Sequence, residues 1–430
     1  MLKKVLIVFV LIVTFVPLRP CWGGGFESFG IGSRQLGMGG AAIGLADDWR
    51  AIYWNPAGLA FLEGTAGGQD IRANFVEGWS NRSLRNVESP NRLLGDFQIV
   101  YPTEPREFRR TFDSTTVVSP NGGGYRNFGD WTIGGGGYGT AGTGSDWHDR
   151  VPTLNGDFLK AKYESDVFVL NVPFCVARKL SDKLAVGVAV SALYGESYRD
   201  VAKRYQPQPF SPFPPYDIAF TSDASGFGIA GDVGILFKPC EELSMGVIYR
   251  SPFTMRLSGH ADITNTLAGA VLTSDVVQRM YYPARIGAGI AVRPFERLVW
   301  TADVNYINWS HLTIKLNYDP ESVFLTDSRI DYDFKDTTAF RTGLEYLLTK
   351  GWAIRAGVFT DPSPYRDEWG SVVTARFPDA NVVTLGVGKQ VGSFAFDVPY
   401  GYAFTERREV GGVVYDGKQN NFAVGVTLAF

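Results

Sequence analysis

The most restrictive feature of this sequence is an alternation of residue type with a period of two. Segments of roughly ten residues place an apolar side chain at every second position, and turn residues separate the segments. In the last segment the apolar face consists of Phe422, Val424, Val426, Leu428 and Phe430. The opposite face consists of Ala423, Gly425, Thr427 and Ala429. The pattern predicts strands with one face toward an apolar medium and the other toward a crowded or polar interior.

The same alternation recurs in residues 184–191, 284–293 and 394–405, where the charged residues lie opposite the aliphatic ones. A soluble β-sandwich alternates too, but its solvent-facing side carries charges on nearly every strand. After residue 25 no apolar run approaches the length of a spanning helix, which excludes a helical membrane bundle. Besides a helix bundle, the structure that hydrogen-bonds every backbone N–H and C=O group within a bilayer is a closed barrel. The sequence therefore predicts an all-β, antiparallel transmembrane β-barrel.

Two kinds of connection alternate along the chain. Short turns are expected near residues 179–182, 239–242, 294–297, 349–350 and 392. Long polar or proline-rich loops are expected near residues 141–163, 199–222, 259–279, 315–333, 362–380 and 409–418. Counting the strands between them predicts about fourteen, an even number that places both termini on the periplasmic side. The stretch 103–129 does not fit, because it is long and charged where a short periplasmic turn is expected.

The N-terminus has the features of a secretory signal peptide, which we expect to comprise residues 1–23. Lys3 and Lys4 precede an apolar run at residues 5–16, and small residues follow, so cleavage after Gly23 is expected. The rival interpretation is a single membrane anchor. The run of about 12 residues is shorter than the roughly 20 that a spanning helix needs.

Residues 24–66 lack the alternation and precede the first predicted strand. We therefore expect them to fill the lumen as a hatch, with residues 67–430 forming the barrel. Small residues such as Gly39 and Gly40 allow short helices to pack closely inside a narrow space. Asp47 and Asp48 can cap the start of a helix, and the pair Asn55-Pro56 favours a turn. The expected hatch residues also include Asp47, Asp48, Asn55, Pro56 and Ala57.

The hatch run extends from Gly37-Met38-Gly39-Gly40 through Ala46-Asp47-Asp48 to Asn55-Pro56-Ala57-Gly58-Leu59. Further characteristic runs are Tyr282-Pro283-Ala284-Arg285-Ile286-Gly287, Asn305-Tyr306-Ile307-Asn308-Trp309-Ser310 and Arg355-Ala356-Gly357-Val358-Phe359-Thr360-Asp361-Pro362-Ser363-Pro364. Through these runs the sequence resembles the FadL/TodX family of outer-membrane transporters for long-chain fatty acids and toluene. The resemblance spans most of the chain after the predicted signal peptide. It implies a fourteen-stranded barrel with an N-terminal hatch, and ligand capture among the outer loops.

The resemblance also implies that ligand binding shifts the hatch and that a kink in the third strand opens a lateral gap. Gly134, Gly135, Gly136 and Gly137 fit such a kink, since glycines inside a strand mark bulges or bends. The alternative is a regular glycine-rich strand that packs closely on the hatch.

A proline-rich stretch at residues 206–216 carries three aromatic residues, Phe210, Phe213 and Tyr216. Apolar side chains gathered in an exposed loop indicate a binding surface. One interpretation is a groove that captures an apolar ligand. The other is that the outer loops pack on one another and seal the barrel.

Seven charged residues are expected on the lumen face of the strands. They are Arg285, Arg293, Asp303, Arg341, Glu345, Arg355 and Asp397. One of the arginines would pair with a ligand carboxylate, or the charges neutralise one another and hold the hatch. The second interpretation is favoured for most of them.

Composition and motifs argue against several other functions. A net charge of −3 argues against a nucleic-acid partner. His148, His260 and His311 lack metal-ligand spacing, and no G-x-S-x-G motif is present. We therefore expect no metal, no cofactor, no catalytic residue and no enzyme activity. Cys175 and Cys240 are too few for a disulfide framework, although the periplasm permits one bridge.

The alternation and the resemblance together predict a passive outer-membrane channel for hydrophobic compounds such as long-chain fatty acids or aromatic hydrocarbons. One alternative is a plugged-barrel shuttle or anchor component of a protein secretion system. Another is a general porin, against which a hatch in the lumen argues. The expected partners are a hydrophobic ligand, the outer membrane with its lipopolysaccharide and, during biogenesis, the barrel-assembly machinery. A monomer is expected.

Overall fold

The computed structural model describes most of the chain. The described residues are 30–83, 107–111, 115–152, 158–205, 214, 216–322, 325–366, 379–405, 408–410 and 413–429. The predicted signal peptide at residues 1–23 and the terminal Phe430 lie outside them.

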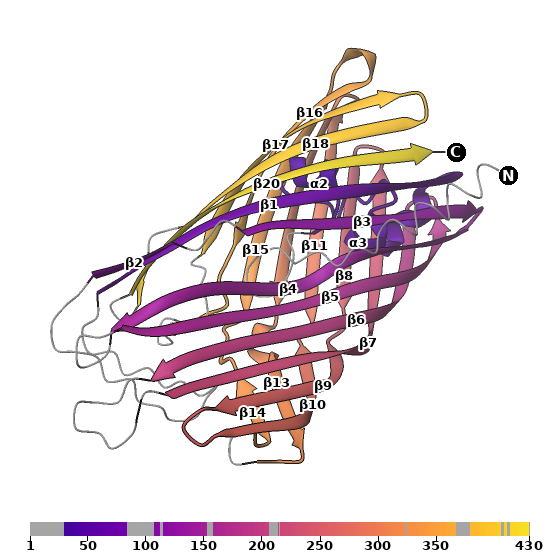
Figure 1. The fold of residues 1–430 in the computed structure, drawn as a ribbon. Coiled ribbons are helices and arrows are strands. Elements are labelled where there is room, and N and C mark those ends of the chain that lie inside the picture. Colours follow the sequence, from indigo (N-terminus) through magenta and orange to yellow (C-terminus); the bar gives the residue numbers. More distant parts are fainter. Residues whose placement is uncertain are drawn as a thin grey trace.

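Fourteen strands form a closed antiparallel barrel (Figure 1). In order around the wall they are β1 (Thr65–Ser83), β3 (Thr115–Phe128), β4 (Trp131–Pro152), β5 (Phe158–Ser181), β6 (Leu184–Tyr205), β7 (Tyr216–Cys240), β8 (Leu243–Arg250), β11 (Arg285–Phe295), β12 (Leu298–Ile307), β15 (Thr337–Leu347), β16 (Trp352–Asp361), β17 (Ala380–Val391), β18 (Phe394–Thr405) and β20 (Val413–Ala429). The β20–β1 ladder, from Ala66↔Ala429 to Arg82↔Val413, closes the ring. The predicted fold class is confirmed.

Four wall strands are interrupted and continue outward as a second set of strands. The continuations are β9 (Phe253–Asn265), β10 (Ala270–Tyr282), β13 (Thr313–Asp319) and β14 (Ser328–Asp331). Pro252 and Pro283 lie at two of the interruptions, and the short helix η2 (Trp309–His311) lies at a third. Because proline cannot donate to a ladder, it ends regular pairing there. β9 pairs with the outer part of β7, and β13 pairs with β10 and β14, so the wall extends beyond the interruptions.

Two small strands complete the outer end of the barrel. β2 (Glu107–Thr111) pairs with the outer end of β1, and β19 (Arg408–Val410) pairs with the outer end of β20. At the other end the strands meet in short turns, and η3 (Thr349–Gly351) forms one of these. β1 begins and β20 ends at this end, as the even strand number predicts.

The strands are longer than the alternation predicts. Most described residues in 141–163, 199–222, 259–279 and 315–333, which we expected to be loops, belong to strands, and β7 alone has 25 residues. The stretch 103–129, which did not fit a short periplasmic turn, contains β2 and β3, and Gly129-Asp130 makes the short turn after it. Outside lipid a strand needs no apolar face, so the alternation ends before the β-structure does.

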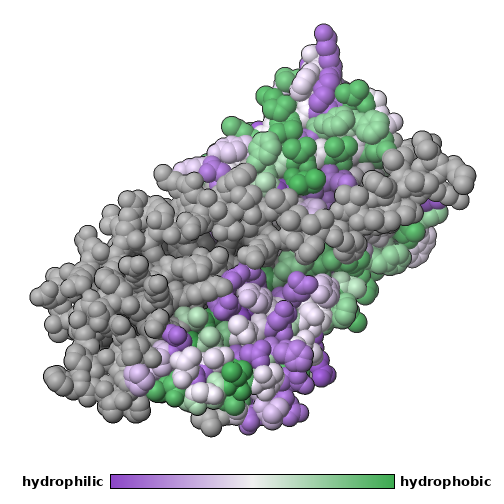
Figure 2. Space-filling view, in the orientation of Figure 1, coloured by the Kyte–Doolittle hydropathy of each residue, from purple (hydrophilic) through white to green (hydrophobic). Residues whose placement is uncertain are grey.

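The outward face of the wall is apolar in a band with aromatic residues at both edges. Exposed aromatic residues toward the short turns include Phe128, Trp131, Phe237, Phe295, Trp352 and Phe394. Those toward the outer end include Tyr249, Tyr306, Phe340, Phe404 and Phe422. Figure 2 shows apolar side chains over β16 to β18 and a more polar surface over β9, β10, β13 and β14. Two aromatic girdles around an apolar band are typical of an outer-membrane barrel.

The hatch segment lies inside the barrel (Figure 1) and forms three short helices. They are α2 (Ser33–Gly37), α3 (Ala51–Trp54) and η1 (Pro56–Phe61). Nearly all of their side chains are buried, since the barrel wall surrounds them. Among the described residues, no helix is long and apolar enough to cross a membrane.

Candidate functional site

One face of the hatch is joined to the wall by buried ion pairs. The Arg34 guanidinium donates to Asp47 at 2.6 Å and to Glu345 of β15 at 2.7 Å. Arg355 of β16 donates to Glu345 at 2.6 Å and pairs with Asp397 of β18 at 2.8 Å. Glu345, Arg355 and Asp397 are buried. A continuous chain of charges therefore connects the hatch to three wall strands.

A second buried ion pair joins Arg50, the residue before α3, to β1. Arg50 donates from Nε and Nη2 to the two carboxylate oxygens of Asp70, both at 2.9 Å. Asp48 accepts from Arg50 Nη1 at 3.1 Å and from the Arg50 backbone N–H at 2.8 Å. Burial alone would raise the pKa of Asp48, but the charges of Arg50 and Arg34 lower it below its ordinary value. Asp48 is therefore charged at neutral pH.

The Asn-Pro-Ala run forms a buried turn, as its sequence predicts. Asn55 Nδ2 donates to the carbonyl oxygens of Ile43 at 3.2 Å and of Ile235 on β7 at 3.0 Å. Asn55 Oδ1 accepts from the backbone N–H of Ala57 at 3.1 Å, and Pro56 begins η1. One amide side chain thus fixes the turn and links it to the wall.

The two glycines after α2 bring the hatch backbone against the wall. Gly39 and Gly40 have φ angles of 66° and 65°, a left-handed conformation that glycine adopts without strain. The Gly39 N–H donates to Thr384 Oγ1 at 3.0 Å. A Cβ atom on Gly39 would lie 2.6 Å from the Thr342 carbonyl oxygen. Only a residue without a side chain fits here.

The opposite face of the hatch is apolar. Ile52 and Leu59 pack against β4, where a Cβ on Gly136 would lie 2.7 Å from Ile52 Cδ1. A Cβ on Gly134 would lie 2.9 Å from Leu59 Cδ1. The buried wall residues of this cluster are Tyr138, Cys175, Ala177, Ala185, Ala189, Leu236 and Ile248. The hatch therefore contacts β4 to β8 through close packing, with few directional bonds.

The wall is interrupted at the same glycines. β3 and β4 pair from Phe128↔Trp131 only to Gly122↔Gly137, although both strands continue outward. β4 and β5 pair at Gly135 and again at Tyr138, but the register gives Gly136 and Gly137 no partner on β5. Gly134 and Gly136 face the hatch, whereas a Cβ on Gly137 would meet nothing within 4 Å. The structure therefore combines close packing on the hatch with an interrupted ladder.

Further charged residues of the wall contact the hatch higher in the lumen. Asp303 accepts from the backbone N–H groups of Ala42 at 2.6 Å and Ile43 at 2.9 Å. Arg285 donates to the Tyr53 hydroxyl at 3.3 Å. These contacts support the interpretation that luminal charges hold the hatch.

The other predicted luminal arginines behave similarly. Arg293 donates to Asp47 at 3.3 Å, and the Arg341 guanidinium lies over the rings of Trp54 and Phe359. Sequence reasoning missed four further charged residues of this network, Arg34, Arg50, Asp70 and Arg250. Arg34 and Arg50 lie within the predicted hatch, residues 24–66. A charged side chain in a segment enclosed by the barrel needs a partner on the wall, and this was the available signal.

The outer half of the lumen holds a large apolar cluster, which we call the outer cluster. Its buried members include Val169, Leu193, Met255, Leu257, Met280, Tyr282, Trp309, Leu312 and Phe334. They come from β5, β6, β9, β10 and the segments around η2 and β14. Sequence reasoning missed this cluster because it treated much of this region as loops.

The remaining predicted residues are placed as follows. Tyr216 begins β7 and pairs in register with Tyr205, while Phe210 and Phe213 lie outside the described residues. Cys175 is buried, Cys240 is exposed, and they form no disulfide. No group of three or more His, Cys, Asp or Glu residues suited to a metal ion occurs in the described part of the chain.

A closed antiparallel barrel with an apolar outer band and a buried N-terminal segment is a plugged outer-membrane barrel. Residues 22–426 match the family described as outer membrane protein transport protein (OMPP1/FadL/TodX), and the chain belongs to this family. The family and the fold place the protein in the bacterial outer membrane.

Solved structures share the fold. A FadL homologue of Pseudomonas aeruginosa superposes with a TM-score of 0.73 at 17% identity, covering 94% of this chain and 100% of that one. The toluene transporter TodX of P. putida gives a TM-score of 0.70 at 18% identity, covering 94% and 99%. The monoaromatic hydrocarbon channel CymD gives 0.66 at 17% identity, also covering 94% and 99%. No protein with a curated description matches the sequence.

Proposed function

We propose that this protein is a passive transporter for hydrophobic compounds such as long-chain fatty acids or aromatic hydrocarbons. The outer cluster carries the proposal, because it provides an enclosed apolar environment at the outer end of the lumen. The hatch lies below it and fills the lumen on the periplasmic side. The resemblance to a toluene transporter and a monoaromatic hydrocarbon channel supports this substrate class.

In the proposed route, Phe210, Phe213 and Tyr216 capture the ligand, which then enters the outer cluster. Ligand binding shifts the hatch, and the ligand leaves laterally between β3 and β4. The end of the β3–β4 ladder at Gly122↔Gly137 supports this exit. The apolar packing of the hatch on β4 supports the shift, because such contacts break without leaving charges unpaired.

Mass spectrometry of co-purifying small molecules tests the function. Barrel extracted from native outer membranes is compared with barrel refolded in ligand-free detergent, and apolar ligands are expected only in the native sample. Leu257→Trp fills the outer cluster and should remove the ligand, whereas Leu385→Trp alters a leucine that is 57% exposed on the outward face and should retain it.

An empty lumen in native barrel would overturn the proposal. If a stoichiometric protein companion co-purified with that empty barrel, the secretion-component alternative would replace it. Steady ion conductance through the wild-type barrel would instead indicate a porin.

A further inference from the structure

Four cationic side chains form a row across the outward face of β9, β10, β13 and β14. They are directly paired from strand to strand, and we call them the cationic row: Arg256 of β9, Arg279 of β10, Lys315 of β13 and Arg329 of β14. Directly paired residues of an antiparallel ladder point to the same side of the sheet, with Cβ atoms about 5 Å apart. Figure 2 shows the polar surface of the strands that carry the row.

Three members of the row have no carboxylate partner. Within the described ranges, Arg256, Arg279 and Lys315 form no ion pair. Arg279 donates to the neutral Asn317 side chain at 2.6 Å, and the Lys315 ammonium lies 5.5 Å from the Tyr281 ring centroid. Their positive charges are therefore available to a ligand.

Two carboxylates adjoin the row at its β14 end. Asp331 pairs with Arg329 at 2.8 Å, and Asp327 accepts from Asn317 at 2.6 Å. Like charges directly opposite each other on neighbouring strands are destabilising. The row therefore costs stability, and an anion that carries several negative charges would remove this cost.

The row begins at the outer edge of the apolar band. Arg256 is paired in register with Phe227 of β7, which is 73% exposed on the outward face. The Phe227 ring contacts that of Tyr194 on β6, with centroids 5.4 Å apart. The next outward residues of β7 are Ser225 and Asp223, which are polar. The aromatic edge of the band thus passes directly into the cationic row.

From this edge the row rises away from the hydrocarbon. The line of directly paired residues that starts at Trp131 of β4, in the girdle toward the short turns, reaches Phe340 of β15, in the outer girdle. Such lines climb outward with strand order because the strands are tilted. With strands about 4.8 Å apart and tilted by roughly 40°, each member stands about 3 Å above the previous one. The row therefore lies at the level of lipid headgroups.

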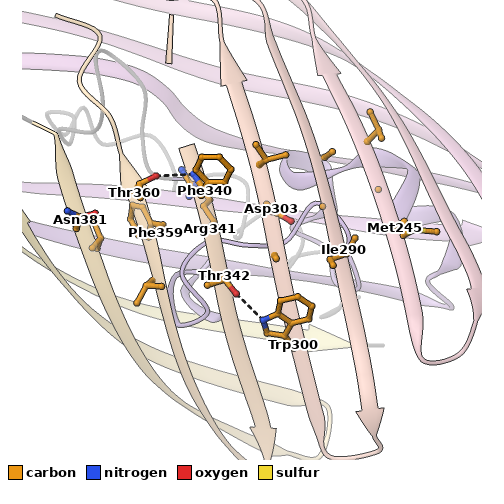
Figure 3. A pocket seen from close by; sticks show the side chains of 18 of the residues that line it. Met245, Ile290, Trp300, Asp303, Phe340, Arg341, Thr342, Phe359, Thr360 and Asn381 are labelled. Atoms are coloured by element: carbon orange, nitrogen blue, oxygen red, sulfur yellow. Dashed lines mark hydrogen bonds between the residues drawn. The ribbon is translucent and has the colours of Figure 1, made fainter. Parts of the chain in front are cut away.

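An apolar groove of about 1050 Å³ lies on the outward face of the wall below the row. Its lining includes β8, β11, β12 and β15, the wall strands whose outward continuations carry the row. Trp300 and Phe340 line it from adjacent strands and are exposed on the outward face (Figure 3). The Trp300 indole N–H donates to Thr342 Oγ1 at 3.0 Å, so the polar atom of this ring is already bonded. The groove therefore offers an apolar surface to hydrocarbon chains.

We propose that the cationic row and the groove form one binding site for an outer-leaflet lipid with a phosphorylated headgroup, which in an outer membrane is lipopolysaccharide. The phosphate groups lie on the row, because guanidinium groups donate paired hydrogen bonds to phosphate oxygens. The acyl chains lie in the groove. Charge complementarity and the place of the row above the apolar band argue for this occupant. The site does not depend on the compound that the lumen transports.

Binding of purified lipopolysaccharide to the full-length barrel in detergent tests the site. The double variant Arg256→Gln, Lys315→Gln removes two unpaired charges of the row. Its matched control is Arg178→Gln, because Arg178 is also an exposed cation of the outward face but lies at the girdle toward the short turns. Val358→Trp fills the groove, and Val424→Trp is its control, with nearly equal exposure of the two valines, 48% against 45%. A second probe is lipopolysaccharide from which the phosphate groups have been removed.

The double variant is expected to bind the intact probe roughly 25-fold more weakly than the wild type, since each cation near an anionic lipid surface contributes roughly fivefold in affinity. The wild type should bind the dephosphorylated probe as weakly as the double variant binds the intact one. Val358→Trp should also weaken binding, and both controls should leave it unchanged. Heat-modifiable gel mobility confirms that each variant is folded.

Two results would overturn the row as a phosphate site. One is equal affinity of the wild type and the double variant for the intact probe, and the other is equal affinity of the wild type for the two probes. Weaker binding by the double variant together with unchanged binding by Val358→Trp would overturn the groove as the acyl-chain site, and would indicate that the row binds a water-soluble polyanion.

Discussion

The hatch has two faces that are held in different ways. Toward β15, β16, β18 and β1 it is held by buried ion pairs, such as Arg34 with Glu345 and Arg50 with Asp70. Toward β4, β5 and β6 it is held by apolar packing on small residues. Buried ion pairs are directional and costly to break singly, whereas apolar contacts exchange partners gradually.

Under the proposed function, the difference between the two faces predicts how the hatch would move. The charged face is expected to remain attached and act as a hinge, while the apolar face slides along β4. The interrupted β3–β4 ladder lies on the sliding side.

The largest effect is expected from Arg355→Met, which breaks the charged face. The substitution leaves the buried carboxylates of Glu345 and Asp397 without their shared partner, a loss of about 3–5 kcal/mol. Urea unfolding in liposomes should show the destabilisation, and planar-bilayer recordings should show raised conductance through a loosened hatch.

The control for this prediction is Arg329→Met. Arg329 pairs with Asp331 at 2.8 Å but is 58% exposed, so about 0–1 kcal/mol is expected. Equal effects of the two substitutions would refute the contrast between the buried and the exposed pair.

A smaller effect is expected from Gly136→Ala, which adds a methyl group to the apolar face. The new Cβ would lie 2.3 Å from the Gly122 carbonyl oxygen and 2.7 Å from Ile52 Cδ1, and overpacking costs about 1–3 kcal/mol. Gly137→Ala is the matched control, because its Cβ would meet nothing within 4 Å. The unfolding midpoint in urea should fall for the first variant only, and a fall for both would contradict this packing.

Ile52→Val is expected to weaken the apolar face slightly. It removes one methylene group from a buried contact, at about 0.5–1.5 kcal/mol. Limited proteolysis should detect more frequent hatch opening, while closed-state conductance stays unchanged because the ion pairs persist. Ile286→Val on the outward face is the control, and a conductance rise for Ile52→Val would show that the apolar face also seals the lumen.

The smallest effect is expected from moderate acidification. Because the folded pKa of Asp48 is lowered, its contribution to stability is fully present above the ordinary aspartate value and is lost as pH falls through the folded pKa. Conductance should therefore stay low from neutral pH to mildly acidic pH. An increase already near pH 6 that disappears in Asp48→Asn would contradict the lowered pKa.

The barrel could be predicted because lipid imposes its pattern directly on the sequence. Each spanning strand must show an apolar outward face, as Phe394, Phe396 and Val398 do. The placement of Glu345 and Arg355 on the lumen face follows from the same alternation. Their partners could not be predicted, because Arg34 and Glu345 are 311 residues apart and meet only through the closed barrel.

The outer cluster could not be predicted for a related reason. Its members come from strands that have left the membrane, where no alternation is imposed, and from segments between Val167 and Phe334. The end of the β3–β4 ladder was equally hidden. The run of glycines at residues 134–137 indicated where the wall could bend, but not that the ladder ends there.

The length of β7 has a consequence for where the protein meets its surroundings. Twenty-five residues at about 3.3 Å each, tilted by roughly 40°, rise about 60 Å, whereas the apolar band is about 25 Å tall. Roughly 30 Å of the wall therefore stands above the hydrocarbon. Under the proposed function, an oily molecule from the external water meets the apolar outer cluster before it reaches the level of the hydrocarbon.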